Sequence, residues 1–343
     1  MNSFASRVIA WQRRHGRNTL PWQANRDPYR VWLSEIMLQQ TQVATVVPYF
    51  ERFTTRFPDL ASLAAADEDD VLALWSGLGY YSRARNLHAA AREIVAAHGG
   101  RFPATQMAIA ELPGVGRSTA AAIAATAFGE HCAILDGNVK RVLARHRGVE
   151  GWTGERTVEN TLWRLADTLL PASGIEAYTQ GMMDLGALVC TRSRPQCAAC
   201  PVHDDCLART YGRTEELPSP RPRKTLPEKA VQMLLLIERG ALLLEKRPAK
   251  GIWGGLWSLP ELAPEDDATT ICHRLGLRVA SRQDLDPLAH TFTHFRLQIL
   301  PVRLELAARG APSEKQAWFA PEQALAAGLP APVRKLVAGL VMS

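Results

Sequence analysis

Residues 112–116 read LPGVG and stand directly before an alanine-rich stretch that begins near Ser118. Glycine tolerates positive φ and has no side chain, so Gly114 and Gly116 allow successive backbone N–H groups to point outward where a helix begins. Such N–H groups suit a phosphate group. The leucine and valine of the segment would hold the two flanking helices together. The segment predicts a tight turn between helices, which either binds phosphate or only connects them.

The sequence on both sides of this turn has a helical pattern. Apolar residues recur every three or four positions in several stretches before about residue 210. These stretches are 31–43, 71–75, 87–95, 120–128, 139–145 and 158–169. We therefore expect a mainly α N-terminal region.

A proline- and arginine-rich segment then changes the composition. Residues 217–227 read LPSPRPRKTLP, which cannot continue a helix and favours an extended connector. The predicted organisation is a helical region, a connector and a smaller C-terminal domain, with bounds 1–216, 217–229 and 230–343.

The C-terminal part has a different periodicity. Residues 231–237 and 241–246 flank Glu238-Arg239-Gly240 in the manner of a β-hairpin. Further β-type segments lie within 291–306, whereas 263–275 and 321–327 have helical patterns. We expect an α+β domain here.

Charge and hydropathy limit the class of protein. The net charge is +6, which favours a polyanionic partner without making the whole surface strongly basic. No apolar run is long enough to cross a bilayer, and no secretory segment opens the chain. We expect a soluble, cytoplasmic protein with no membrane partner.

Four of the six cysteines crowd into seventeen positions. Their spacing is Cys190-x6-Cys197-x2-Cys200-x5-Cys206, and such crowding in an intracellular chain favours a metal over disulfides. Four soft thiolate ligands suit either an iron–sulfur cluster or tetrahedral zinc. The residue chemistry leaves both open.

Two carboxylates occupy distinctive positions. Glu35 lies within the apolar stretch 32–38, where burial would raise its proton affinity, although a surface position on the polar side of a helix is the alternative. Asp136 precedes an apolar-periodic stretch and is placed as a helix N-cap, whose donors would favour the ionised form. One protonated and one ionised carboxylate are what cleavage of a glycosidic bond requires.

These features together resemble a known superfamily. The turn at 112–116, Asp136 and the cysteine loop are similar to the helix–hairpin–helix DNA glycosylases. Within that superfamily, residues 32–42 (WLSEIMLQQTQ) and 134–139 (ILDGNV) resemble the adenine DNA glycosylases of the MutY family. The likeness extends over nearly the whole chain.

The resemblance implies a reaction and a partner. The partner would be double-stranded DNA in which adenine is mispaired with 8-oxoguanine or guanine. Glu35 would protonate adenine, Asp136 would stabilise the cationic sugar, and Asn138 would orient the carboxylates. Water would complete hydrolysis and leave an abasic site. The cysteines Cys190, Cys197, Cys200 and Cys206 would carry a [4Fe–4S] cluster that supports the DNA-binding surface.

The resemblance also assigns residues that contact DNA. Gln40 and Tyr80 would form the wedge that fills the duplex after the base leaves it. The turn with Gly114 and Gly116 would contact a phosphate. Ser118 replaces the lysine that related endonuclease III enzymes use to form an imine, so strand cleavage is not expected. The adenine pocket would be lined by Trp22, Leu38, Val43 and Gln180.

The C-terminal domain resembles the family's Nudix-like module. Gly255-x5-Glu261 is similar to the opening of a Nudix box, but the acidic pair that should follow is missing, so magnesium-assisted nucleotide hydrolysis is not expected. Phe292, Thr293 and His294 match the loop that probes 8-oxoguanine, with threonine where serine is usual.

Three alternatives remain beside this interpretation. One is an endonuclease III-like glycosylase and AP lyase, one is a nucleotide-pool hydrolase, and one is a non-catalytic mismatch-binding protein. Ser118 and the extra domain argue against the first, and the incomplete Nudix box argues against the second. The preferred interpretation is a monofunctional adenine glycosylase, monomeric and associated with the nucleoid.

Overall fold

The computed structural model describes residues 3–222, 225–274, 276–308 and 312–341. These residues form two compact units. The first unit contains the chain up to Ala65 and from Ala89 into the connector. The second contains Ala66–His88 and the chain beyond the connector. The division assigns 66–88 to the C-terminal part, whereas the predicted domain bounds at 217 and 230 follow composition alone and stay predictions.

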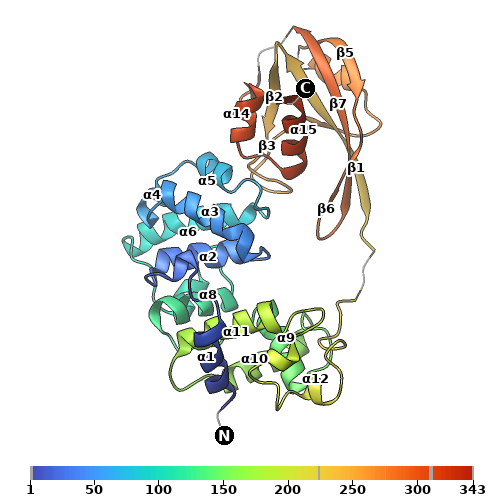
Figure 1. Cartoon of the computed structure of the whole chain (residues 1–343). Helices are drawn as coiled ribbons and strands as arrows, with labels where there is room; N and C mark the ends of the chain where they lie inside the picture. The colour runs from blue at the N-terminus through green and yellow to red at the C-terminus, as the bar shows by residue number, and fades with distance from the viewer. Residues whose placement is uncertain (1–2, 223–224, 275, 309–311, 342–343) are drawn as a thin grey trace. The chain divides into compact units, whose positions relative to one another are not determined.

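The first unit is built from helices and short helical turns, as predicted (Figure 1). Its N-terminal helix begins at Phe4, where the Ser3 hydroxyl accepts a hydrogen bond from the Ser6 N–H and caps the first turn. Helix α6 (Ser82–His98) leads into this unit from the second. The other elements are α1 (Phe4–His15), η1 (Pro21–Gln23), α2 (Pro28–Leu38), α3 (Val43–Arg56), α4 (Leu60–Ala64), α7 (Gln106–Ala110), α8 (Arg117–Ile123), η2 (Ala124–Phe128), α9 (Gly137–Arg147), α10 (Arg156–Thr168), α11 (Ile175–Asp184), η3 (Leu185–Val189), η4 (Cys197–Ala199) and α12 (Leu207–Thr210).

One predicted helical stretch is wrong in its extent. The pattern over 31–43 predicts one helix, but α2 ends at Leu38 and α3 begins at Val43. Between them Gln40 has a φ of 59°, which a right-handed helix does not accommodate. The polar residues 39–42 interrupt the apolar spacing here, and Leu38 and Val43 face a common cavity from the ends of the two helices.

The turn at 112–116 joins α7 to α8. Leu112 and Val115 are buried beneath it, while Gly114 and Gly116 are exposed. Gly114 has a φ of 77°, so this position needs glycine, whereas Gly116 is the extended N-cap residue of α8. The apolar residues of the turn therefore hold the two helices together, as the sequence predicts.

The second unit is built around an eight-stranded mixed sheet (Figure 1). The predicted hairpin is confirmed, because β1 and β2 pair antiparallel with Glu238 opposite Ala241. The sheet order is β3-β2-β1-β7-β5, with β4 on β1, β6 on β7 and β8 on β2. The strands are β1 (Glu228–Glu238), β2 (Ala241–Lys246), β3 (Trp257–Ser258), β4 (Glu261–Leu262), β5 (Arg278–Asp284), β6 (Leu288–Thr291), β7 (Arg296–Ala308) and β8 (Gln316–Phe319).

Helices cover both faces of this sheet. In β1, Met233 and Leu235 belong to the core shared with α14 (Pro321–Ala326) and α15 (Ala331–Val341). The intervening residues Leu234 and Leu236 belong to the core shared with α13 (Ala268–Arg274). Side chains of a strand alternate between faces, so a strand buried on both sides is a continuous apolar run. The helix predicted at 263–275 is shorter than expected, since α13 begins only at Ala268.

Candidate active site

An open cavity of about 700 Å³ lies in the first unit. Its walls come from α2, the loop between α2 and α3, the start of α9, the segment before α2, and the end of α11 with the turn that follows it. A cavity of this size is typical of a site that encloses a small organic group. Eight residues named from the sequence line it, namely Trp22, Glu35, Leu38, Gln40, Val43, Asp136, Asn138 and Gln180.

Glu35 lies on α2 at the wall of this cavity. Its neighbours Ser34 and Ile36 are buried, and Glu35 itself is half-buried where it lines the cavity. Burial raises the pKa of Glu35 to about 7, the negative charge of Asp136 adds to this, and the Arg17 guanidinium opposes it. A carboxyl group with a pKa near neutrality is protonated often enough to act as a general acid.

Asp136 is the N-cap of α9, as its sequence position predicts. Its Oδ1 accepts a hydrogen bond from the Val139 N–H at 2.7 Å, and its Oδ2 accepts one from Asn138 Nδ2 at 3.3 Å. These bonds and the nearby Arg141 lower the pKa of Asp136, but burial outweighs them and the net shift is upward. The expectation of a shift towards ionisation is therefore wrong in sign.

Hydrogen bonding nevertheless distinguishes the two carboxyl groups. A negative charge on Asp136 raises the pKa of Glu35 further. The hydrogen-bond donors on Asp136 stabilise its carboxylate, whereas among the residues that the structure describes no such donor lowers the pKa of Glu35. When the pair holds one proton, that proton belongs on Glu35.

Arg141, which the sequence analysis missed, fixes Asn138. Its Nη2 donates to Asn138 Oδ1 at 2.8 Å and to the Gly186 carbonyl at 2.6 Å, and its Nε donates to the Cys190 carbonyl at 2.7 Å. Gly186 is required there, because a Cβ would lie 2.5 Å from Asn138 Cβ. The spacing from Asn138 to Arg141, close to one helical turn, was the available signal.

A second group that the sequence analysis missed centres on Asp184. This residue is fully buried, and its carboxylate accepts hydrogen bonds from the Arg17 N–H and Nε, both at 2.7 Å, and from Gln180 Nε2 at 2.8 Å. Asp184 thereby fixes two residues that line the cavity. An aspartate in the apolar stretch that ends α11 was the signal in the sequence.

The turn between α7 and α8 leads to a neighbouring surface. Gly116 and Ser118 line a separate pocket, and Thr119 lines both that pocket and the cavity. Ser118 Oγ accepts a hydrogen bond from the Leu135 N–H at 2.9 Å, just before Asp136. The hydroxyl therefore ties the turn to the backbone that carries the carboxylate.

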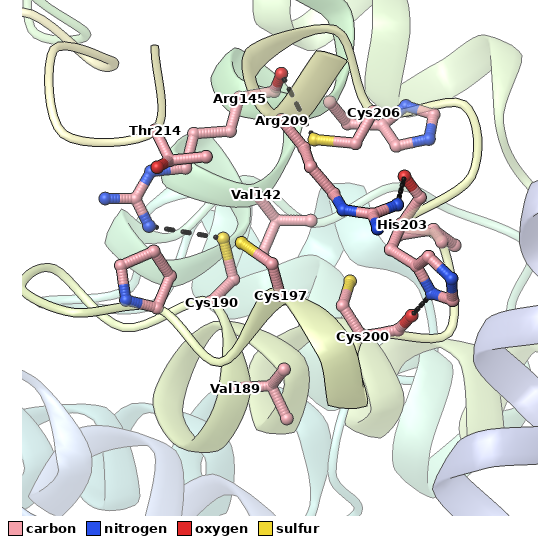
Figure 2. Close-up of a pocket in the computed structure, with 13 residues that line it drawn as sticks. Val142, Arg145, Val189, Cys190, Cys197, Cys200, His203, Cys206, Arg209 and Thr214 are labelled. Atoms are coloured by element: carbon pink, nitrogen blue, oxygen red, sulfur yellow. Dashed lines mark hydrogen bonds between the residues drawn. The ribbon is translucent and has the colours of Figure 1, made fainter. Parts of the chain in front are cut away.

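All four cysteines of the loop line one pocket, and Figure 2 shows their sulfur atoms directed into the same space. Arg145 Nη1 lies 3.4 Å from Cys190 Sγ. Burial and the neighbouring thiols raise the pKa of Cys200 to about 12. In the described parts of the chain, no three His, Cys, Asp or Glu side chains have the arrangement that holds a single metal ion.

A separate cavity of about 720 Å³ lies within the second unit. Tyr80, Phe292, Thr293 and His294 line it, so the structure brings together the wedge tyrosine and the loop predicted from the sequence. Thr293 and His294 are exposed, and Tyr80 is exposed with a φ of 49°. Gln40 lines the first cavity instead.

Comparison with known proteins agrees with this arrangement. Residues 33–168 match the HhH-GPD superfamily of base excision DNA repair proteins, and residues 232–339 match the NUDIX domain. The chain is 36% identical to the adenine DNA glycosylase of Buchnera aphidicola subsp. Acyrthosiphon pisum (strain APS), covering 97% of this chain and 96% of the relative. It is 34% identical to the adenine DNA glycosylase of Homo sapiens, and the match covers 89% of this chain and 68% of the human protein.

The chain belongs to the adenine DNA glycosylase family. It is an enzyme of base excision repair with a helix–hairpin–helix region and a Nudix-like domain. Among the described residues, no helix combines the length and the apolar character needed to cross a membrane.

Solved structures agree on the fold of the N-terminal region. A thermostable thymine-DNA glycosylase is 30% identical, with a TM-score of 0.55 over 61% of this chain and 95% of that one. An endonuclease III in a non-covalent DNA complex is 21% identical, with a TM-score of 0.51, and the match covers 60% of this chain and 92% of that one. Each match spans nearly all of the solved chain and about three fifths of this one, so the shared fold covers part of this chain.

Asp184 should contribute strongly to the stability of this adenine glycosylase fold. Replacing Asp184 by alanine leaves the partly buried Arg17 guanidinium without its carboxylate, and we expect a loss of about 3–5 kcal/mol in the free energy of unfolding. Asp167→Ala, which removes an exposed partner of Arg117, should cost below about 1 kcal/mol. Urea unfolding of the full chain, followed by circular dichroism, measures both. Equal losses would contradict a special role for Asp184.

Proposed function

We propose that this enzyme hydrolyses the N-glycosidic bond of adenine mispaired with 8-oxoguanine or guanine in double-stranded DNA. The observation that carries the proposal is the convergence of Glu35 and Asp136 on one cavity from two separate helices. We expect a monomer that acts in the cytoplasm, associated with the nucleoid.

Adenine must leave the duplex before it reaches the two carboxyl groups, at a cost of roughly a few kcal/mol. We propose that Gln40 and Tyr80 enter the vacated space. Both are exposed and have left-handed backbone angles, with φ of 59° and 49°, which project a side chain from a loop. Backbone strain of this kind concentrates at functional sites.

We infer that the extruded base enters between apolar and polar walls of the cavity. The indole of Trp22 is buried and packs edge-on against Phe50, so the wall that it forms is rigid. Leu38 and Val43 add the apolar ends of α2 and α3. Gln180 presents an amide group, held by Asp184, that can hydrogen-bond the edge of a purine.

Bond cleavage then requires one proton and one negative charge. Protonated Glu35 donates to adenine, at N7 by the family resemblance, and the bond to the sugar breaks with its electrons going to the base. Asp136 stabilises the positive charge that develops on the sugar, and Asn138 fixes the position of that carboxylate. Water attacks the sugar carbon and gives one proton to the Glu35 carboxylate, which restores the acid and leaves an abasic site.

Strand cleavage is not part of the proposed reaction. An imine with the sugar needs a primary amine, and Ser118 offers a hydroxyl that accepts a backbone hydrogen bond. The turn before it would bind a phosphate through backbone N–H groups, with Gly114 and Gly116 exposed at its tip.

We propose that Phe292, Thr293 and His294 contact 8-oxoguanine opposite the adenine. Their exposure around one cavity supports this role. Hydrolysis of nucleotides by the same domain is disfavoured, because the Glu261 carboxylate binds Arg247 and the remaining acidic residues of a Nudix box are missing from the sequence.

We propose that the four cysteines hold a [4Fe–4S] cluster. Four thiols directed into one pocket, with an arginine beside Cys190, suit a bound group that carries negative charge from its sulfur ligands. Thiolate ligands of this kind are the ones that iron–sulfur clusters use. When bound, the cluster would give the cysteine loop 190–206 a rigid support.

Adenine release tests the whole assignment. Duplexes with adenine opposite 8-oxoguanine should break at the adenine after alkali and remain intact before it. Glu35→Gln and Asp136→Asn should each lower the single-turnover rate by about a hundredfold or more. Asparagine still caps a helix, so the second variant should fold normally. Breaks before alkali would instead indicate a glycosylase and lyase.

The rate should depend on pH through the same two groups. Glu35 must be protonated to donate, so the single-turnover rate should fall about tenfold per pH unit above about 7. Asp136 must be ionised, and its raised pKa predicts a second decline on the acid side. A rate that stays constant from pH 6 to 9 would remove Glu35 as the acid.

Metal analysis tests the cofactor. The purified protein should contain about four iron atoms and four sulfide ions per chain, with the broad visible absorption of an iron–sulfur cluster. Cys200→Ser should lose both, whereas Cys272→Ser, a buried thiol in the second unit, should keep them. Zinc in place of iron would contradict the cluster.

A further inference from the structure

A group of aromatic side chains in the second unit has no part in bond cleavage. Trp253 lies with its ring centroid 5.5 Å from that of His290 and 5.2 Å from that of Phe292, and Phe292 stacks on the buried Phe295 at 4.6 Å. We call Trp253, His290, Phe292 and Phe295 the aromatic cluster. Its members come from the loop 251–255 and from the hairpin formed by β6 and β7.

The aromatic cluster fixes the exposed tip of that hairpin. Thr291 pairs with Arg296, so residues 292–295 form the turn, and the Phe292 N–H donates to the Phe295 carbonyl at 2.9 Å. The two phenylalanine rings point into the cluster, while Thr293 and His294 between them are exposed. The packing of the two phenylalanine rings therefore determines the positions of the Thr293 hydroxyl and the His294 imidazole.

Trp253 itself is held in an unfavourable conformation. Its φ of 55° lies in the left-handed region, which a large aromatic residue rarely adopts. The surrounding contacts must offset this strain. Arg247 supplies several of them, since its Nε donates to the Ile252 carbonyl at 3.0 Å and its guanidinium lies 5.7 Å from the Trp253 ring centroid.

Arg247 is in turn anchored by Glu261. The Arg247 Nη1 binds the Glu261 carboxylate, and both side chains are largely removed from solvent. Glu261 is the one carboxylate that remains of the Nudix-box pattern beginning at Gly255. Because the Glu261 carboxylate is paired with Arg247, it supports the loop 251–255 and is not free to bind magnesium.

The geometry points to Arg247 and Trp253 as positioning residues that set the preference for 8-oxoguanine over guanine opposite adenine. This inference rests on the proposed function. Neither residue needs to touch the base. The two purines differ in one oxygen and one N–H, which 8-oxoguanine has and guanine lacks. A small displacement of the turn 292–295 would lengthen hydrogen bonds to these two groups and so weaken the discrimination. The reaction at adenine takes place in the first unit and should not depend on them.

The test compares two duplexes, with adenine opposite either 8-oxoguanine or guanine. Single-turnover adenine release and the dissociation constant, the latter in a Glu35→Gln background, are measured on both. Trp253→Ala and Arg247→Gln should reduce the preference for the 8-oxoguanine duplex by about three- to tenfold, the range of an aromatic contact, with little change on the guanine duplex. Trp253→Phe should retain most of the preference.

A matched control uses Arg282, which pairs with Asp284 on β5 of the same sheet. Arg282→Gln removes the same charge from the same domain and should leave the preference unchanged. Thermal unfolding identifies any variant that fails to fold. Should Trp253→Ala do so, Arg247→Gln and Glu261→Gln provide the comparison.

Three outcomes overturn the inference. Equal loss on both duplexes would show a general defect, an unchanged preference in every variant would show that the contacts do not position the loop, and a wild-type enzyme without preference would leave nothing to set. A wild-type enzyme that releases adenine from neither duplex is a different result, which overturns the proposed function itself.

Discussion

Two carboxyl groups, those of Glu35 and Asp136, face one cavity and influence each other's ionisation. Burial raises the pKa of both, yet only Asp136 has hydrogen-bond donors that stabilise its charge. The charge on Asp136 then keeps a proton on Glu35 near neutral pH. The proposed division of labour between acid and charge stabiliser thus follows from unequal hydrogen bonding at two similar groups.

Helix α9 connects this pair to the rest of the first unit. Its first turn carries the cap Asp136 and the amide of Asn138, and its later turns carry Val142, Arg145 and His146, which line the cysteine pocket. Ser118, two residues after the turn at 112–116, accepts a hydrogen bond from the Leu135 N–H just before this helix. A single helix therefore aligns the cavity, the turn proposed to bind phosphate and the cysteine loop, and displacement of its first turn would disturb all three.

Three features were predictable from the sequence because they depend on neighbouring residues: the N-cap at Asp136, the turn at 112–116 and the β-hairpin at 238–241. The direction of the pKa shift of Asp136 could not be predicted, because the burial of its carboxyl group depends on segments that are far apart in the chain. The break at Gln40 was missed although residues 39–42 are all polar and interrupt the apolar spacing. Arg17 and Asp184 were missed because their pairing joins residues 167 positions apart.

In the second unit, one ion pair connects the Nudix-like sequence pattern to the loop 251–255. A Nudix box uses several carboxylates around magnesium, and here one of them, Glu261, is neutralised by Arg247. An isolated carboxylate in that half-buried position would be costly, so its arginine partner and the loop packed on that arginine form one unit. The surface presented by the neighbouring hairpin is then constrained by this ion pair. Recognition of the opposite base can in this way depend on residues that stand behind the contacting loop.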